Sequence, residues 1–303
     1  MTTDGISEPS GIPDDGGPAT SWPAGSVDPF LEAQVARLVD LMAGRRTLVI
    51  SGAGVSTDSG LPDYRGQGST EEPSIEFDMF VADPVWQRWV WQRNHETWQA
   101  VAALQPSPAH RAIAALEAAG LVSGVATQNV DGLDAAAGTR SLWELHGSFR
   151  EVECLDCGRR IARSEYAQLL DALNPGWPTD PDPAHVAILA TARRAEAEAS
   201  TFEVAPCPAC GGVMKPAVVF FGEGLPSAME QAMAAAQNAE VALVVGTSLV
   251  VSTGMWVTRQ AWANGADVVV VNMGPTQGDS FADLVINENA SLVLPEVARR
   301  LGA

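Results

Sequence analysis

Residues 47–66 read TLVISGAGVSTDSGLPDYRG. The stretch starts with an apolar run and passes directly into a turn that is rich in glycine and in hydroxyl side chains. A short apolar run that ends in glycines is typical of a buried parallel strand that feeds a tight turn. The stretch therefore predicts a strand–turn–helix unit whose backbone N–H groups can hold a pyrophosphate at a helix N-terminus.

This turn only half matches the fingerprint of dinucleotide-binding dehydrogenases. The fingerprint requires Gly-x-Gly-x-x-Gly or Ala, and then an acidic residue at the end of the next strand that holds the ribose. Gly52 and Gly54 fit its beginning, but Thr57 stands at the third glycine position. The acidic residues about 20 positions further on, Glu71 and Glu72, lie in a polar loop. A P-loop is excluded because no Gly-Lys-Ser/Thr sequence follows.

Further short apolar runs repeat the style of the first one and end in polar residues or glycine: 124–130, 242–249, 267–274 and, more weakly, 282–286. Helical patterns stand between or before them at 28–44, 109–120 and 227–240. Strands that alternate with helices predict an α/β fold, a Rossmann-like parallel sheet with helices on both faces. The polar endings GAG, TQN, GTS and NMG should converge at the carboxyl edge of this sheet, where such folds bind ligands.

Two segments interrupt the alternation of strands and helices. Residues 67–105 hold a polar loop and then a Trp-rich helical pattern, which predicts a helical lid with its aromatic face on the core, compatible with lining a substrate pocket. Residues 149–215 carry all four cysteines and are expected to form an inserted small module. The expected Rossmann-like domain, lid included, therefore comprises 29–148 and 216–303. Residues 1–28 are expected to be a disordered tail.

The cysteines form two C-x-x-C pairs, Cys154 with Cys157 and Cys207 with Cys210. Four thiolates complete the tetrahedral shell of Zn²⁺, so the predicted metal is structural rather than catalytic. A thioredoxin-type redox pair is the alternative, but a glycine follows each pair, which suits zinc knuckles better. His185 lies between the pairs and is expected at the surface rather than on the metal.

The charge balance limits the classes of partner. The 303 residues include 37 acidic and 18 basic side chains, a net charge of −19. Direct nucleic-acid binding is not expected, because it needs clustered Lys and Arg. An acidic surface favours lysine-containing peptides, or it only keeps an Ala-rich protein soluble. No apolar run is long enough to span a membrane, and the N-terminus lacks the features of a signal peptide, so a cytoplasmic protein is expected.

A further group of polar residues lies in TQNVDGL (127–133) and ELHGS (144–148). Gln128, Asn129 and Asp131 follow a predicted strand, and they suit the binding of a ribose and an amide. His146 is the best candidate for a general base in a chain with four histidines. There is no Ser-His-Asp pattern and no cysteine outside the two pairs, so a protein nucleophile is not indicated.

The motifs follow one another in a recognisable order: GAGVSTDSGLPDYRG, TQNVDGL, ELHG, the two cysteine pairs, VVFFGE (218–223), VGTSL (245–249) and VNMGPT (271–276). In this order they resemble the sirtuin family, from about residue 31 to the C-terminus, and GLPDYRG, GTSLVVSTG and NMGPTQGD are most similar to its class II branch. The resemblance implies an NAD⁺-dependent protein-lysine deacylase. In the family's chemistry the acyl oxygen of the substrate attacks C1′ of the ribose, nicotinamide leaves, and O-acyl-ADP-ribose and free lysine form.

The resemblance also implies roles for individual residues. NAD⁺ would be bound by Gly52, Ala53, Gly54, Ser56, Asp63, Tyr64, Arg65, Gln128, Asn129, Asp131, Gly246, Thr247, Ser248, Asn272 and Ala290. His146 would act as general base on the ribose hydroxyls, with Asn129 and Asp131 also catalytic. The acyl-lysine peptide would pair with the backbone of Val219, Phe220, Phe221 and Gly222 as an added strand. One structural Zn²⁺ would be held by Cys154, Cys157, Cys207 and Cys210.

The sequence departs from the family pattern at several positions. Asp134 stands where the family often has His, and we expect it to affect a structural contact more than catalysis. Glu288 stands where the family often has Gly, so the loop on the adenine side is expected to differ. The lid has no tyrosine and thus lacks the Tyr-x-x-Arg pair that reads succinyl-type acids, although Arg88 or Arg93 could still meet an acidic acyl group.

Alternative functions stay open at this point. The resemblance to the class II branch also implies mono-ADP-ribosyltransferase activity as an alternative, and a non-catalytic NAD-binding module is a third possibility. The expected partners are acylated lysine peptides and proteins, with no membrane contact, and the expected oligomeric state is a monomer.

Overall fold

The computed structural model describes residues 28–62, 73–186 and 190–303. Its larger part is a six-stranded sheet in the order β3-β2-β1-β7-β8-β9, and every pairing in it is parallel. In sheet order the strands are β3 (Leu142–Glu144), β2 (Val122–Thr127), β1 (Thr47–Ser51), β7 (Val241–Val245), β8 (Asp267–Val271) and β9 (Leu284–Ile286). The predicted Rossmann-like parallel sheet is confirmed, and the sequence analysis did not predict β3.

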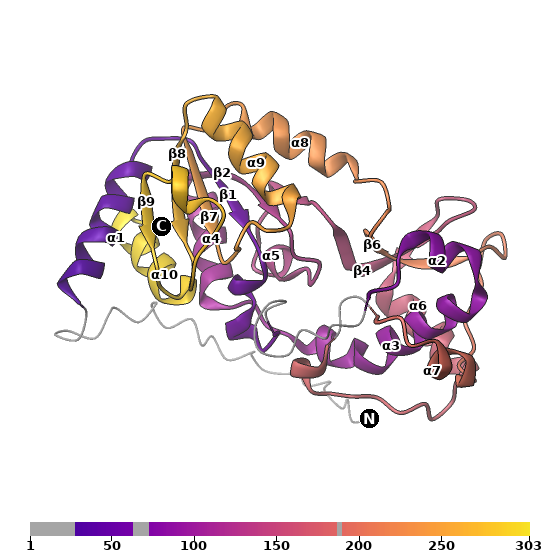
Figure 1. Ribbon diagram of the computed structural model, residues 1–303. Helices are drawn as coiled ribbons and strands as arrows, with labels where there is room; N and C mark the ends of the chain where they lie inside the picture. The colour runs from indigo at the N-terminus through magenta and orange to yellow at the C-terminus, as the bar shows by residue number, and fades with distance from the viewer. Residues whose placement is uncertain (1–27, 63–72, 187–189) are drawn as a thin grey trace, which may run out of the picture.

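Helices cover both faces of this sheet, as Figure 1 shows. On one face lie α1 (Pro29–Met42), α4 (Pro108–Ala118) and α10 (Ala290–Leu301), and on the other lie α8 (Ser227–Ala236) and α9 (Ser252–Ala263). Strand β1 shows why two cores form. Val49 joins the cluster with α1, whereas Leu48 and Ile50 join the cluster with α8 and α9, because successive side chains of a strand point to opposite faces. The predicted helices on both faces are thus confirmed.

The helix ends are encoded locally. Asp28 accepts a hydrogen bond from the N–H of Phe30 at 3.1 Å and caps α1, and Gly44 follows the helix in the left-handed conformation. Ser107 caps α4 in a capping box with His110. The remaining short helical elements near the sheet are η1 (Ala53–Val55), η2 (Thr57–Ser59), α5 (Leu133–Ala136) and η4 (Asp279–Phe281).

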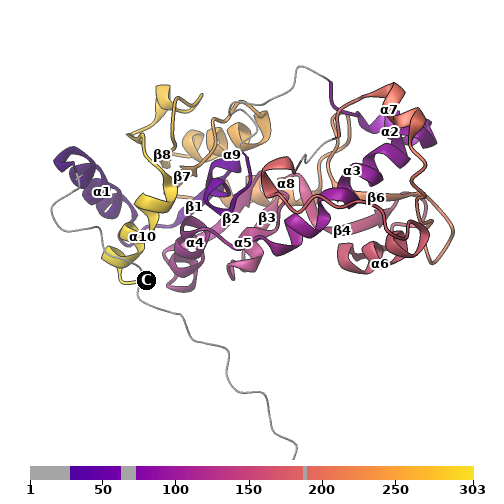
Figure 2. The same cartoon turned by 90° about the horizontal axis from the view of Figure 1, so that it is seen from below.

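A second body lies to one side of the parallel sheet in both Figure 1 and Figure 2. Its centre is an antiparallel sheet in the order β5-β4-β6, which the sequence analysis did not predict. The elements of this body are α2 (Phe77–Ala82), α3 (Pro84–Ala103), β4 (Gly147–Cys154), β5 (Arg160–Ala162), α6 (Arg163–Leu173), η3 (Pro183–His185), α7 (Arg194–Ala199) and β6 (Met214–Val218).

The tryptophans of α3 pack against the small sheet. Trp86 and Trp89 share a buried cluster with Phe149 and other residues, and Trp91 shares another with Cys154 and further residues of the cysteine module. The domain boundaries expected from the sequence stay a prediction. The packing groups α2 and α3 with the cysteine module rather than with the parallel sheet. None of the helices within the described ranges has the length and apolar content that a membrane crossing needs.

Candidate active site and metal centre

The glycine-rich turn after β1 interlocks with the loop after β7. The N–H of Gly52 donates to the carbonyl of Val245 at 3.1 Å, and the N–H of Gly54 donates to that of Gly246 at 2.8 Å. A Cβ on Gly54 would lie 2.8 Å from the Cα of Gly246, and a Cβ on Gly246 would lie 2.5 Å from the backbone nitrogen of Val55. Gly246 also has φ +58. Only glycine fits this approach of two backbones, which leaves a cradle without side chains at the edge of the sheet.

Behind the turn lies a buried group of polar side chains. The sequence predicted that the polar residues after β2 would lie close to this turn. The side-chain amide of Asn129 donates to the carbonyl of Gly52 and to the hydroxyl of Ser56, both at 3.1 Å. The hydroxyl of Ser56 donates in turn to the carboxylate of Asp131 at 2.8 Å. Asp131 also accepts from the backbone N–H of Leu133 at 2.8 Å. The turn and the end of β2 are therefore held in one fixed arrangement.

His146 lies just past β3, next to this group. Its Nδ1 lies 2.8 Å from the carbonyl oxygen of Gln128, and its Nε2 lies 2.9 Å from the hydroxyl of Thr253. Burial lowers the pKa of His146 below its usual value, and the hydrogen bond to the Gln128 carbonyl opposes that shift. The ring is therefore neutral near pH 7 and can accept a proton.

Two neighbouring groups in the same region have strongly shifted pKa values. Asp134 is 2 % exposed, and burial together with the negative charge of Asp131 raises its pKa to about 7. His110 of α4 is fully buried, and burial lowers its pKa to about 4. At neutral pH the site thus contains a neutral imidazole and a carboxyl group that is partly protonated.

The other predicted NAD⁺ residues follow neighbouring strands on the same edge of the sheet. Thr247 and Ser248 follow β7, and the N–H of Asn272 after β8 donates to the carbonyl of Ile286 at 3.1 Å. Ala290 begins α10 and is buried in one cluster with Val55 of the turn. Ala53 is the first residue of η1. Asp63, Tyr64 and Arg65 lie outside the described residues, as do the tail before residue 28 and residues 67–72 of the expected lid.

The segment predicted to bind the peptide begins directly beside the histidine. The N–H of Val219 donates to the carbonyl of His146 at 2.8 Å, and the carbonyl of Phe221 accepts from the N–H of Phe77 at 2.9 Å. Phe221 is 56 % exposed, and Gly222 has φ +82. The segment therefore joins the small sheet and α2 to the edge that carries His146.

Sequence reasoning missed Lys215, the only lysine in the chain. It is 1 % exposed, and its ammonium lies 3.1 Å from the carboxylate of Glu223 and 3.3 Å from that of Glu153. It also donates to the carbonyl of Val218 at 2.7 Å. The same Glu223 oxygen accepts from the N–H of Phe220 at 2.9 Å, so this buried pair shapes the segment 218–223. A lysine inside the apolar run 213–221 was the available signal.

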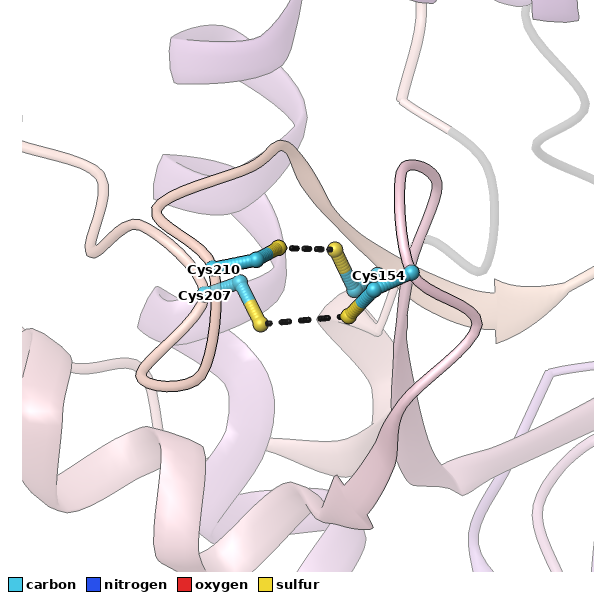
Figure 3. Close-up of side chains that lie close together, drawn as sticks. Cys154, Cys207 and Cys210 are labelled. Carbon is cyan, nitrogen blue, oxygen red and sulfur yellow. Dashed lines mark hydrogen bonds between the residues drawn. The ribbon is translucent and has the colours of Figure 1, made fainter.

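The four cysteines meet as predicted (Figure 3). The sulfur of Cys154 lies 3.5 Å from that of Cys210, the sulfur of Cys157 lies 3.8 Å from that of Cys207, and all four are within 4.8 Å of one another. Zn–S bonds of about 2.3 Å in a tetrahedron place sulfurs about 3.8 Å apart, so the set fits Zn²⁺. No disulfide joins them. His185 is 64 % exposed and pairs with Asp180, which confirms its expected place at the surface.

The arginines considered for an acidic acyl group are differently placed. Arg93 forms an ion pair with Glu96 at 2.8 Å, and its guanidinium lies over the ring of Trp89 at 5.9 Å. The Nε of Arg88 is buried without a hydrogen-bond partner among the described residues. Arg93 is therefore already paired within α3, so its position does not support a specificity for acidic acyl groups.

Comparison with known proteins decides the family. The profile described as Sir2 family matches residues 52–253, which include the glycine turn, the polar group, His146 and all four cysteines. The chain belongs to the Sir2 family. The expected sirtuin resemblance is thereby confirmed.

Relatives of this Sir2 protein cover most of its length. NAD-dependent protein deacetylase 1 of Mycobacterium avium is 39 % identical over 271 residues, 89 % of this chain and 96 % of the relative. The human mitochondrial NAD-dependent protein lipoamidase sirtuin-4 is 36 % identical over 277 residues, 89 % of this chain and 86 % of the relative. A solved Sir2 structure with a p53 peptide and NAD⁺ superposes with a TM-score of 0.69 at 28 % identity, covering 88 % of this chain and 98 % of that one.

Proposed function

We propose that this protein is an NAD⁺-dependent protein-lysine deacylase, which moves the acyl group of an acyl-lysine peptide to ADP-ribose and releases nicotinamide. The observation that carries the proposal is the neutral, partly buried His146, which lies at the sheet edge beside the glycine cradle and the Asn129 group. Its Sir2 relatives with matching length are named NAD-dependent protein deacetylases.

The edge of the parallel sheet fits a dinucleotide. Gly52, Gly54 and Gly246 leave a cradle that a Cβ would fill, so a cofactor can approach the backbone of the turn closely. We assign to NAD⁺ the residues predicted from the sequence at this edge, with Gln128, Asn129 and Asp131 nearest to His146. Bound NAD⁺ supplies an electrophilic ribose carbon and the leaving nicotinamide.

His146 is assigned the role of general base. Its Nδ1 faces a carbonyl oxygen, which can only accept, so Nδ1 carries the ring proton and Nε2 is an acceptor, whose lone pair the hydroxyl of Thr253 occupies at 2.9 Å until a ribose hydroxyl displaces it. Nε2 can therefore take a proton from a ribose hydroxyl. Asn129 and Asp131 fix the hydroxyl of Ser56 between them, and so they hold the turn in place while the base acts.

The substrate peptide is assigned to the segment Val219–Gly222. Lys215 and Glu223 hold this segment from behind, and Val219 is bonded to the backbone of His146, so a peptide strand added there lies next to the base. Zn²⁺ on the four cysteines has no open position and holds the small module together. A Sir2 relative with known structure binds a p53 peptide, in keeping with this assignment.

The test uses acyl-lysine peptides with acetyl, propionyl, succinyl and lipoyl groups, and it measures nicotinamide release. His146→Ala should lower kcat by about 10²- to 10⁴-fold, whereas the control His185→Ala should keep the wild-type rate, because His185 is exposed and far along the chain in η3. The buried Lys215 is the only lysine, so the enzyme offers no exposed acyl-lysine of its own. Full activity in His146→Ala would contradict the proposal.

The same assay separates the alternative functions. Transfer of labelled ADP-ribose to protein without an acyl-lysine peptide indicates a mono-ADP-ribosyltransferase, and NAD⁺ binding without turnover of any peptide indicates a non-catalytic module. The expected monomeric state and cytoplasmic location stay predictions, to be checked by light scattering and by fractionation of the source cells.

A further inference from the structure

Thr253 lies in the first turn of α9. It contacts the Nε2 edge of the His146 ring, opposite to the Nδ1 edge that faces the backbone carbonyl of Gln128. It is 5 % exposed, and its hydroxyl oxygen lies 2.9 Å from His146 Nε2 and 3.1 Å from the side-chain nitrogen of Gln128. Thr253 was not predicted as a site residue, although it follows the VGTSL motif closely in the sequence.

The direction of each hydrogen bond follows from the groups involved. The carbonyl of Gln128 can only accept, so His146 Nδ1 is the donor and Nε2 must be an acceptor. The hydroxyl of Thr253 therefore donates to Nε2. Its oxygen is then free to accept from the amide nitrogen of Gln128, which also donates to the carbonyl of Val251 at 3.2 Å.

The chain of hydrogen bonds continues into the loop after β7. The amide oxygen of Gln128 accepts from the hydroxyl of Thr247 at 2.8 Å, and Thr247 accepts from the N–H of Leu249 at 3.2 Å. Leu249 has φ 56, a positive value that no other non-glycine residue of the described ranges has. Gly254 makes room for the amide, because a Cβ there would lie 2.7 Å from its oxygen. The donor and the acceptor of every hydrogen bond in this series are therefore fixed.

We propose that Thr253 is a positioning residue for His146: its hydroxyl holds the Nε2 lone pair of the resting enzyme, and through Gln128 and Thr247 it couples the base to the loop after β7. The inference rests on the proposed function, since it concerns the same base. That loop includes Gly246 to Ser248, which we assign to NAD⁺. A shift of Thr247 when the cofactor binds would therefore move the Gln128 amide and the Thr253 hydroxyl, which contacts His146.

The hydrogen bond from Thr253 should lower the pKa of His146. A hydrogen bond donated to Nε2 stabilises the neutral ring and disfavours protonation. The titratable side chains on the elements around His146 are Asp131 and Asp134 after β2, His110 on α4, Glu144 at the end of β3, Arg150 on β4 and the exposed Arg259 on α9. The lowered pKa of His146 follows from burial, which the hydrogen bond to the Gln128 carbonyl opposes, and none of these charges contributes to it. Removal of the Thr253 hydroxyl should therefore raise the pKa of His146.

The experiment compares wild-type protein with Thr253→Val, which keeps the shape of the side chain but removes the hydroxyl, and with Thr253→Ser, which restores it. Long-range ¹H–¹⁵N NMR on the NAD⁺-free protein follows the ring nitrogens of His146, which are assigned with His146→Asn. A net hydrogen bond of about 0.5–1.5 kcal/mol converts to an upward shift of about 0.4–1 pH unit in Thr253→Val. Thr253→Ser should titrate as the wild type does.

The acidic limb of kcat/KM for nicotinamide release should move upward by the same amount in Thr253→Val. An unchanged His146 titration in a folded Thr253→Val protein, checked by its circular dichroism and melting temperature, would overturn the proposal. The same holds for a Thr253→Ser protein that titrates like Thr253→Val. Because the NMR measurement needs no turnover, a wild-type protein that lacks deacylase activity refutes the proposed function and leaves this test intact.

Discussion

The sheet-edge site and the cysteine module are built in different ways. The site gathers side chains from the ends of β1, β2, β3 and β7 and from α9, so residues as distant as His146 and Thr253 meet only because parallel strands end at one edge. The cysteine module depends on two short turns whose ligands are three residues apart in sequence. The first needs the whole parallel sheet, whereas the second needs the small sheet, its own buried cluster and a metal.

The largest expected effect concerns the metal. Removal of Zn²⁺ with a chelator, or the substitution Cys154→Ser, should unfold the small module, because structural zinc contributes about 10–16 kcal/mol in zinc-finger peptides. Trp91 is buried with Cys154 and Cys207, so its fluorescence should shift to the red. Metal analysis should give about one Zn per chain.

The six-stranded sheet should survive this treatment, so the stabilities of the two regions should separate. Most of the helical circular dichroism should remain after chelation, since α1, α4, α8, α9 and α10 pack on the parallel sheet. Loss of all helical signal at one chelator concentration would mean that the two regions fold as a single unit.

The next effect concerns Lys215, which stands between the two regions. Lys215→Met leaves the carboxylates of Glu153 and Glu223 without their buried partner, so the free energy of unfolding should fall by about 3–5 kcal/mol. The KM for the acyl peptide should rise, because Glu223 holds the N–H of Phe220. Both are measured by urea unfolding and by peptide titration.

Arg160→Ala is the matched control for Lys215→Met. Arg160 pairs with the same Glu153 at 3.0 Å, but its side chain is 56 % exposed, so its removal should cost at most about 1 kcal/mol. Equal losses of unfolding free energy in the two variants would show that burial does not decide the strength of these ion pairs.

A smaller and pH-dependent effect is expected at Asp134 in the sheet-edge site. Its pKa is raised to about 7 in the folded protein by burial and by Asp131, against an ordinary value of 3.8. Between these values the unfolded chain loses the proton and the folded protein keeps it, so stability falls as the pH rises. The loss reaches up to about 4 kcal/mol above pH 7.

Asp134→Asn removes this dependence. The variant should gain stability relative to the wild type as the pH rises from 5.5 to 8 in urea unfolding. Glu144, whose pKa is also raised by burial, is present in both proteins, and its contribution cancels in the difference. A difference in unfolding free energy that stays constant over this range would refute the assignment of the shifted carboxyl to Asp134.

The sequence predicted the parallel sheet and much of the candidate site for a local physical reason. Apolar runs such as TLVI end in glycine or polar residues, and parallel strands bring those ends to one edge, so Gly52, Asn129 and Thr247 could be placed together without coordinates. The spacing of the cysteines predicted two local turns, and their meeting followed from chemistry, since a structural Zn²⁺ takes four ligands and each turn supplies two.

The small sheet escaped prediction because its pairing is not local. β4 and β6 are antiparallel neighbours, yet about 60 residues with two helices lie between them, so no hairpin turn announces the pairing. The tryptophans of α3 predicted a helix correctly, but their pattern carries no information about which sheet they cover.

By itself, the sequence determined the strand–turn glycines, the alternation of strands and helices, the four zinc ligands and the candidate base, because each rests on short-range pattern and chemistry. The tertiary structure alone decided that the only lysine is buried between two carboxylates, that Asp134 lies against Asp131, and that Thr253 donates to His146. These contacts depend on burial, or they join segments that are distant in sequence. Charge and hydrogen-bonding partners in a protein interior depend on which surfaces pack together, and no local pattern encodes that.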